Sequence, residues 1–259
     1  MIGCIIQARM GSKRLPGKIL KKLDTQNTVL DYVVNQITSS KKLEKIVIAT
    51  TEIKEDNIIE EFCKERNIVC FRGSENDVLD RHYQCAKKYS FDPIVRVTSD
   101  NPLIDPEIID LAIEKYENGG FDMITTCNKR SFPYGISVEV FSFDSLKKSW
   151  NNSVLSSERE HVVLYIQNKK NNFKIYNLIN SEDLTHINCT IDNEADYKLL
   201  QKVVFEISER PILLKHVVEL FKRKPELINI NKNSDPYEGH KKSFKQDSII
   251  RKNNLEKDT

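Results

Sequence analysis

Short apolar runs alternate with segments of helical periodicity through the first half of the chain. Strands are predicted where the apolar runs occur, at residues 2–6, 45–50, 68–71 and 93–98. Helices are predicted where apolar side chains recur with helical spacing, at residues 29–37, 55–65, 77–89 and 106–116. Strands and helices that alternate in this way form βαβ units. The pattern therefore predicts an α/β fold with an open, mostly parallel, twisted sheet and helices on both faces.

The pattern changes after Gly120. Two apolar runs, 121–126 and 136–141, are separated by a polar turn that contains Pro133 and Gly135. They predict a small antiparallel insertion, about residues 121–141, which either continues the sheet or protrudes as a hairpin. Further helices are predicted at residues 142–150, 156–168 and 194–205, and further strands at residues 173–178 and in a run that ends with Asp192.

One domain followed by a polar tail is expected. The 259 residues are enough for one sizeable core, and residues 1–229 carry all of the predicted elements. Beyond Asn229 the chain is almost wholly polar and charged. Residues 230–259 are therefore expected to be loosely ordered or to contact a partner subunit.

Composition narrows the classes of function. Forty Lys and Arg residues against 38 Asp and Glu residues leave a net charge of +2, which gives no general case for a nucleic acid partner. Six scattered cysteines without a Cys-x-x-Cys pair favour buried reduced thiols over disulfides or zinc ligands. The sequence shows no signal peptide and no apolar run of about 20 residues, so a cytoplasmic protein without a membrane partner is expected.

The loop after the first strand concentrates positive charge. Its cations are Arg9, Lys13, Arg14 and Lys18. Gly11 and Ser12 lie between them and leave backbone amides accessible to a ligand. Open α/β sheets bind ligands at the carboxyl ends of their strands, so the cluster predicts a polyphosphate site rather than a solvated basic loop. It is neither a Walker A loop nor a Gly-x-Gly-x-x-Gly fingerprint.

Two acidic residues are candidates for a metal site. Asp100 follows the strand at 93–98 and Asp192 follows a later apolar run, so both are expected at the carboxyl edge of the sheet. Carboxylates beside several phosphates hold the Mg²⁺ that bridges them. The structural alternative makes Asp100 a turn residue and Asp192 the N-cap of the helix that begins at Glu194.

Seven segments together resemble a known family. The basic loop reads Ala-Arg-x-x-Ser-x-Arg-Leu-Pro-Gly-Lys over residues 8–18. The other matching segments are residues 49–51, 71–81, 96–106, 138–142, 157–161 and 190–192. In this order they are similar to the acylneuraminate and Kdo cytidylyltransferases, and more narrowly to their spore coat polysaccharide biosynthesis branch. The resemblance spans about residues 2–205.

The resemblance implies a Rossmann-like nucleotidyltransferase fold and an activity. The implied reaction transfers CMP from CTP to a sugar acid of the Kdo, legionaminic or sialic acid type, with release of pyrophosphate, for surface polysaccharide or glycan synthesis. It also implies a Mg²⁺ cofactor and a homodimer. The implied nucleotide contacts are Ala8, Arg9, Gly11, Ser12, Arg14, Lys18, Thr50, Arg72 and Ser74.

The family motifs also carry over catalytic roles. Lys18, Arg14 and Asp100 are the implied catalytic residues, with Lys18 beside the α-phosphate of the nucleotide. Asp100 and Asp192 are the implied Mg²⁺ ligands. Asp196 matches the motif less securely and is expected to stabilise the start of its helix.

The implied acceptor contacts are Arg96, Glu139, Arg159 and His161. Arg96 lies in an apolar strand and needs a carboxylate, which the substrate could supply. Glu139 matches the family, although strand alternation would equally make it face solvent. Residues 158–161 form either a substrate-recognition segment or a structural ion-pair network.

Residues 134–139 depart from the family pattern. They read Tyr-Gly-Ile-Ser-Val-Glu, where relatives usually carry Asp-Gly-Leu-Asp-Val-Glu, so Ser137 replaces a carboxylate near the acceptor site. The identity of the acceptor is therefore open. Arg81 and His82 lie on a predicted helix, where a salt-bridged arginine and a half-buried histidine are expected.

Other functions stay open from the sequence. One is nucleotidyl transfer to a sugar phosphate. A second is a glycosyltransferase that uses a sugar nucleotide, although this chain lacks the Asp-x-Asp motif that such enzymes usually carry. A third is a non-catalytic nucleotide-binding relative.

Overall fold

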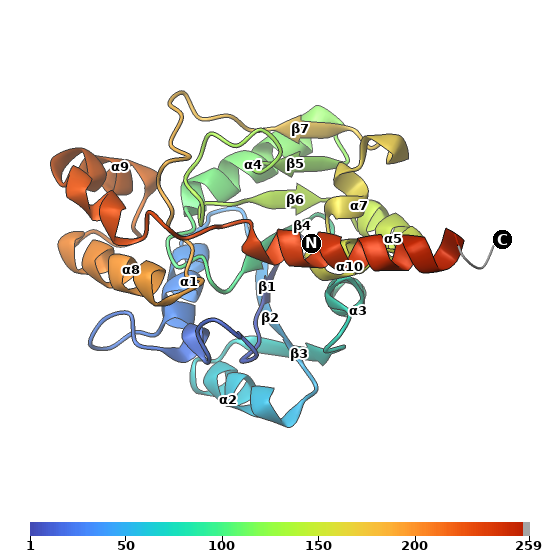
Figure 1. The fold of residues 1–259 in the computed structure, drawn as a ribbon, viewed down its shortest axis with the longest axis horizontal. Helices are drawn as coiled ribbons and strands as arrows, with labels where there is room; N and C mark the ends of the chain where they lie inside the picture. Colours follow the sequence, from blue (N-terminus) through green and yellow to red (C-terminus); the bar gives the residue numbers. More distant parts are fainter. Residues whose placement is uncertain (256–259) are drawn as a thin grey trace.

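The apolar runs of the first half form four parallel strands. The computed structural model describes residues 1–255, and their strands form one seven-stranded sheet in the order β3-β2-β1-β4-β6-β5-β7 (Figure 1). The parallel strands are β1 (Gly3–Gln7), β2 (Lys45–Thr51), β3 (Val69–Gly73) and β4 (Ile94–Thr98). β1 pairs with β2 on one side and with β4 on the other, so the strand order reverses beside β1.

The second half extends the same sheet. Its strands are β5 (Met123–Thr125), β6 (Glu139–Phe141) and β7 (Ile175–Asn177). β6 is antiparallel to both β4 and β5, whereas β5 and β7 are parallel. The predicted insertion therefore continues the sheet and does not protrude as a hairpin, and the predicted mostly parallel sheet is confirmed.

Helices cover both faces of the sheet, as predicted. The helices are α1 (Val29–Thr38), α2 (Asn57–Glu65), α3 (Val78–Tyr89), α4 (Pro106–Gly119), α5 (Phe143–Asn152), α6 (Ser156–His161), α7 (Leu164–Gln167), α8 (Glu194–Glu206), α9 (Leu214–Arg223) and α10 (Glu238–Leu255). Alternate strand residues divide the core: Ile6 packs in the cluster of α1, α2 and α4, whereas Ile5 packs in the cluster of α3, α5 and α7. Among the described residues, none of the helices combines the length and the apolar composition that a membrane-spanning helix requires.

Two predicted elements are wrong. The single helix at 156–168 is broken at Val162, whose φ of 62° is incompatible with a continuous helix, and the shorter helices α6 and α7 result. The strand that was to end at Asp192 is absent from the described sheet. Ile191 instead donates its amide to the carbonyl of Asp100 at 2.9 Å, outside any strand. The Thr190 hydroxyl also donates to Asn101 Oδ1 at 3.0 Å, so several hydrogen bonds hold the two acidic segments together.

The described part of the tail, residues 230–255, contains a helix that the sequence pattern does not predict. Residues from Glu238 form helix α10, which packs against α6 and crosses the front of the sheet in Figure 1. Its polar sequence lacks an apolar stripe, which is why no helix was predicted there. Polar contacts hold it instead, since the buried Asp247 accepts a hydrogen bond from the amide of Ser157 at 3.0 Å.

Candidate functional site

The carboxyl ends of β1, β2 and β4 meet at one edge of the sheet. Gln7 lies in register with Ala49 of β2 and Thr98 of β4, so the chain leaves these strands at nearly the same level. This is the point where the strand order reverses, which is the usual ligand position in such sheets. A cavity of about 1340 Å³ lies here. It exceeds the roughly 300–1,000 Å³ typical of a single ligand site, so it has room for more than one small ligand.

The basic loop is anchored at both ends. The amide of Met10 donates to the Oδ1 atom of the buried Asp56 at 2.7 Å. At the other end Leu15 is buried in the core that surrounds α8 and α9. Gly17 has a φ of 65°, and this left-handed conformation turns the chain into a short 3₁₀ helix that begins at Lys18. The anchors hold Gly11, Ser12 and the loop cations against the cavity.

Lys18 joins the two acidic segments. Its Nζ atom donates to Asp100 Oδ2 at 2.8 Å, to Asp192 Oδ1 at 3.1 Å and to the carbonyl of Ile191 at 2.6 Å. Burial lowers the pKa of Lys18, but the two carboxylates outweigh burial and leave that pKa raised. Burial acts to raise the pKa of Asp100, but the ammonium group of Lys18 outweighs burial and leaves that pKa lowered. Lys18 is therefore charged, and the predicted convergence is observed.

Asp192 is not a helix cap. Asn193 caps α8, because its Oδ1 atom accepts the amide of Ala195 at 2.9 Å. Asp196 is fully buried and accepts the amides of Asp192 and Asn193, so it stabilises the helix start as predicted. The Asp192 carboxylate is thus available to the cavity. Burial and the neighbouring Asp100 raise its pKa, although Lys18 opposes them.

The two carboxylates suit a divalent cation that also binds phosphate. Both contact one ammonium group, so they already surround a single positive charge. In the part of the chain that the structure describes, no group of three or more acidic, His or Cys side chains could hold a metal alone. Mg²⁺ commonly takes one or two carboxylates together with substrate phosphates and water. Asp100 and Asp192 fit that donor set.

Arg14 connects the loop to the C-terminal helix. Its guanidinium lies 2.8 Å from Asp192 and 2.5 Å from Glu238, the first residue of α10. Burial lowers the pKa of Arg14, but these carboxylates leave it raised. Glu238 is mostly exposed, so its contact with Arg14 is readily displaced by a more highly charged anion.

The structure brings six of the nine predicted nucleotide contacts to the cavity. These six are Ala8, Arg9, Gly11, Ser12, Arg14 and Lys18. Thr50, Arg72 and Ser74 are not among the lining residues. Arg72 donates to the carbonyls of Thr51 and Ile53 and pairs with Glu60, so its donors are already engaged, which disagrees with the predicted role. Thr50 is fully buried.

Arg81 and His82 differ in their relation to the cavity. His82 is fully buried with Nδ1 against the carbonyl of Val78, and burial lowers its pKa to about 3, so it is a neutral core residue. Arg81 lines the cavity and is 1% exposed. Burial and the nearby Arg9 lower the Arg81 pKa to about 10. The expected salt bridge of Arg81 is not found among the described residues.

The carboxylate that pairs with Arg96 belongs to the protein itself, to Glu139. Its guanidinium lies 2.6 Å from Glu139 Oε2 and donates to Gln7 Oε1 at 3.1 Å. The pair faces the cavity from neighbouring strands β4 and β6. Glu139 is 6% exposed, so the solvent-facing alternative is wrong. The pair forms part of the polar lining of the cavity.

Loss of one partner of this pair is expected to destabilise the fold. Glu139→Ala leaves the guanidinium of Arg96 buried without its counter-ion, which costs about 3–5 kcal/mol. Urea unfolding would measure this change in the free energy of unfolding. The double variant Arg96→Met with Glu139→Leu should recover most of it, because it removes both charges. A loss below about 1 kcal/mol in the single variant would contradict this account.

Arg159 and His161 line the cavity but are held by neighbours. Arg159 Nε donates to Asp77 Oδ2 at 2.9 Å, and its Nη1 atom donates to the carbonyl of Trp150 at 2.7 Å. The structural ion-pair interpretation of Arg159 is thus observed. His161 Nε2 lies 3.0 Å from Ser243 Oγ, and its ring stacks on His240 at 3.9 Å. Burial lowers the His161 pKa to about 3, so the ring is neutral.

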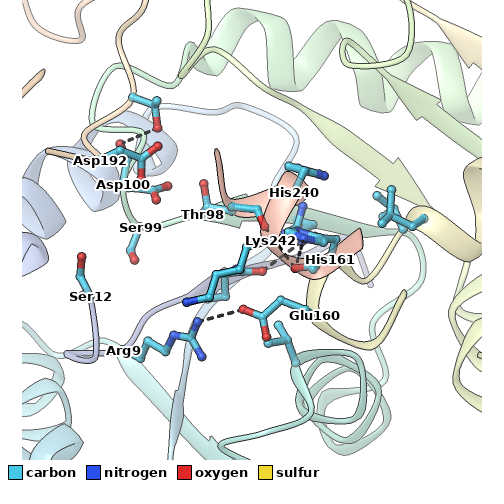
Figure 2. Close-up of a pocket in the computed structure, with 18 of the residues that line it drawn as sticks. Arg9, Ser12, Thr98, Ser99, Asp100, Glu160, His161, Asp192, His240 and Lys242 are labelled. Atoms are coloured by element: carbon cyan, nitrogen blue, oxygen red, sulfur yellow. Dashed lines mark hydrogen bonds and ion pairs between the residues drawn. The ribbon is translucent and has the colours of Figure 1, made fainter. Parts of the chain in front are cut away.

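The sequence prediction missed the C-terminal part of the site. Most residues from 236 to 246 line the cavity, across from the basic loop, and Figure 2 shows His240 opposite Ser12 and Asp100. His240, Ser243 and Asp247 have the spacing of one helix face, and this was the available signal. These residues are polar, whereas a buried helix face is normally recognised in a sequence by apolar residues, so this face was not predicted.

Comparison with known proteins gives relatives over nearly the whole chain. A family model described as cytidylyltransferase matches residues 3–257. The uncharacterized protein MJ1063 of Methanocaldococcus jannaschii is 42% identical over 88% of this chain and 93% of its own. The spore coat polysaccharide biosynthesis protein SpsF of Bacillus subtilis is 34% identical over 86% of this chain and 94% of its own.

Solved structures give the same picture. A cytidylyltransferase from Leptospira borgpetersenii has a TM-score of 0.83 and 36% identity over 88% of this chain and 96% of its own. A CMP:2-keto-3-deoxy-manno-octonic acid synthetase complexed with CTP has a TM-score of 0.59 over 80% of this chain and 99% of its own. Its identity is 15%, so this likeness concerns the fold alone. A 3-deoxy-manno-octulosonate cytidylyltransferase from Chlamydia trachomatis is 29% identical over 51% of this chain and 52% of its own.

Proposed function

We propose, because this chain belongs to the cytidylyltransferase family, that it transfers CMP from CTP to a sugar acid and releases pyrophosphate. The family match covers almost the whole chain and agrees with the resemblance found in the sequence. CTP-dependent nucleotidyl transfer follows from that membership. The sugar acid, of the Kdo, legionaminic or sialic acid type, is the part that we add.

One observation carries the proposal. Lys18 and Arg14 of the basic loop meet Asp100 and Asp192 at one side of the cavity. Cations suit the negative oxygens of a triphosphate, and the carboxylates suit the Mg²⁺ that accompanies it. Figure 2 shows Asp100 and Asp192 together near Ser12, with Arg9 and Glu160 lower in the cavity. The opposite side is left for the acceptor.

In the proposed reaction an acceptor hydroxyl oxygen forms a bond to the α-phosphorus of CTP. The bond from that phosphorus to the bridging oxygen of the β-phosphate breaks, pyrophosphate leaves, and the hydroxyl proton passes to solvent. Lys18 would stabilise the charge on the α-phosphate, since the Nζ donors that now contact Asp100 and Asp192 could instead contact phosphate oxygens. A bound Mg²⁺ would neutralise further charge on the phosphates. Asp100 and Asp192 would hold that ion.

The acceptor class has support from relatives and from charge. The Chlamydia trachomatis relative is named for 3-deoxy-manno-octulosonate, and the Bacillus subtilis relative for spore coat polysaccharide biosynthesis. Arg130 and Lys242 also line the cavity, and neither has a salt-bridge partner among the described residues, which suits an acidic substrate. A sugar phosphate is also acidic, so acceptors of both kinds belong in the assay.

Two measurements test the proposal. Thermal shifts with Mg²⁺ and each of CTP, UTP, ATP and GTP should be largest for CTP, because a ligand stabilises in proportion to its occupancy. Pyrophosphate release should then require CTP together with Kdo, legionaminic acid or N-acetylneuraminic acid, and not glucose 1-phosphate. Equal shifts with all four nucleotides would contradict cytidine selectivity. Turnover with the sugar phosphate alone would contradict the sugar-acid acceptor.

A further inference from the structure

The loop after β5 carries a cation without a counter-ion. Arg130 lines the cavity, and within the described residues no carboxylate lies within 4.0 Å of its guanidinium. The arginines predicted to bind the acceptor are neutralised, since Arg96 pairs with Glu139 and Arg159 with Asp77. A half-buried guanidinium without a counter-ion is costly unless an anion joins it in the working state of the protein.

Two contacts fix the Arg130 side chain and leave donors unused. Its Nη1 atom donates to Ser137 Oγ at 3.1 Å, and its Cζ atom lies 4.6 Å from the centre of the Tyr134 ring. Its Nε atom is buried and has no hydrogen-bond partner among the described residues. The plane of the guanidinium is thus held in place. A planar guanidinium with free N–H groups matches the two oxygens of a carboxylate.

The C-terminal segment forms the facing wall. Tyr237 packs edge-on against Tyr134, with ring centres 5.5 Å apart. His240 stacks on His161, and both rings line the same cavity as Arg130. Neutral imidazoles and phenol groups are suited to the hydroxyl groups of a sugar. The cation and these groups therefore surround a space that fits a polyhydroxylated acid.

We propose that Arg130 binds the carboxylate of the acceptor, in a subsite walled by Tyr134 and the segment 236–246. This inference rests on the proposed function and deepens it. Ser137 has a defined part in it, because a hydroxyl leaves the charge of Arg130 available to the substrate. A carboxylate at position 137 would neutralise that charge.

Steady-state pyrophosphate release, with CTP saturating and the sugar acid varied, tests the subsite. Arg130→Gln should raise the KM for the acceptor roughly 10- to 100-fold, as expected for loss of charge-assisted hydrogen bonds, and Arg130→Lys should lose less. The KM for CTP and its thermal shift should remain close to those of the wild type. Lys129→Gln is the control, because Lys129 is exposed and lies outside the cavity. It should change neither the KM for the acceptor nor the KM for CTP.

Variants at position 137 provide a second, independent test of the Arg130 subsite. Ser137→Asp should raise the acceptor KM about 10-fold or more, because the new carboxylate competes for the guanidinium, whereas Ser137→Ala should change it far less. Lys242→Gln is compared because Lys242 also lines the cavity. An unchanged acceptor KM in Arg130→Gln, or an acceptor KM that rises in Lys242→Gln but not in Arg130→Gln, would overturn this inference while leaving the proposed function intact. A wild-type protein that binds CTP but turns over none of the sugar acids would overturn both.

Discussion

Replacing Lys18 with methionine is expected to lower kcat/KM for CTP by roughly 10²–10³-fold, the usual effect of losing one preorganised donor to developing charge. Methionine keeps the apolar stem and removes the ammonium group, which touches Asp100, Asp192 and the carbonyl of Ile191. The measurement is initial-rate pyrophosphate release with CTP varied.

The loss should appear mainly in kcat. A donor that acts on the transition state contributes little to ground-state binding, so the thermal shift with CTP should fall only modestly. Lys22→Met is the matched control, because Lys22 is exposed and lies outside the cavity. Near-normal turnover in Lys18→Met would remove this residue from the catalytic machinery.

Replacing Asp100 with asparagine is expected to cost several kcal/mol of transition-state stabilisation at limiting Mg²⁺, which corresponds to about 10³-fold in kcat/KM. The change preserves shape but removes the charge that faces Lys18 at 2.8 Å. Raising the concentration of Mg²⁺ should recover part of the rate if the defect is in metal affinity. Asp110→Asn is the control, because Asp110 of α4 is not among the cavity-lining residues and accepts hydrogen bonds from Ser40 and from the amides of Lys41 and Lys42.

A second readout separates metal binding from structure. Mn²⁺ bound to the protein in the presence of CTP can be followed by electron paramagnetic resonance, and Asp100→Asn should weaken that binding while the melting temperature of the free protein changes little. The free protein loses one member of an ion pair, but it also loses a like-charge neighbour of Asp192. Unaltered Mn²⁺ binding would show that Asp100 is not a metal ligand.

The parallel half of the sheet was predictable because its signals are local. Each strand is a short apolar run, and helices such as α4 carry their own caps, with Asp105 before Pro106 and Gly120 at the end. The basic loop was predictable for the same reason, since its cations are close in sequence. Its position at the switch point follows from β1 lying between β2 and β4.

Long-range packing decided what the sequence did not reveal. Arg96 needs a carboxylate, but only the pairing of β4 with β6 identifies Glu139 as that partner. Helix α10 is held by polar contacts with α6, and a hydrophobic pattern does not predict such contacts. Arg72 matches a family segment, yet Thr51, Ile53 and Glu60 take its donors. In each case the deciding partner lies on another element.

The central claim is that the cations of the basic loop and the two distant carboxylates surround one metal-bound nucleotide. A crystal structure with Mn²⁺ and a non-hydrolysable CTP analogue tests it directly, since the anomalous signal locates the metal. We predict a metal peak between Asp100 and Asp192, with Lys18 and Arg14 on the phosphates and Glu238 displaced. A nucleotide bound away from Lys18, or a metal bound away from both aspartates, would contradict the account.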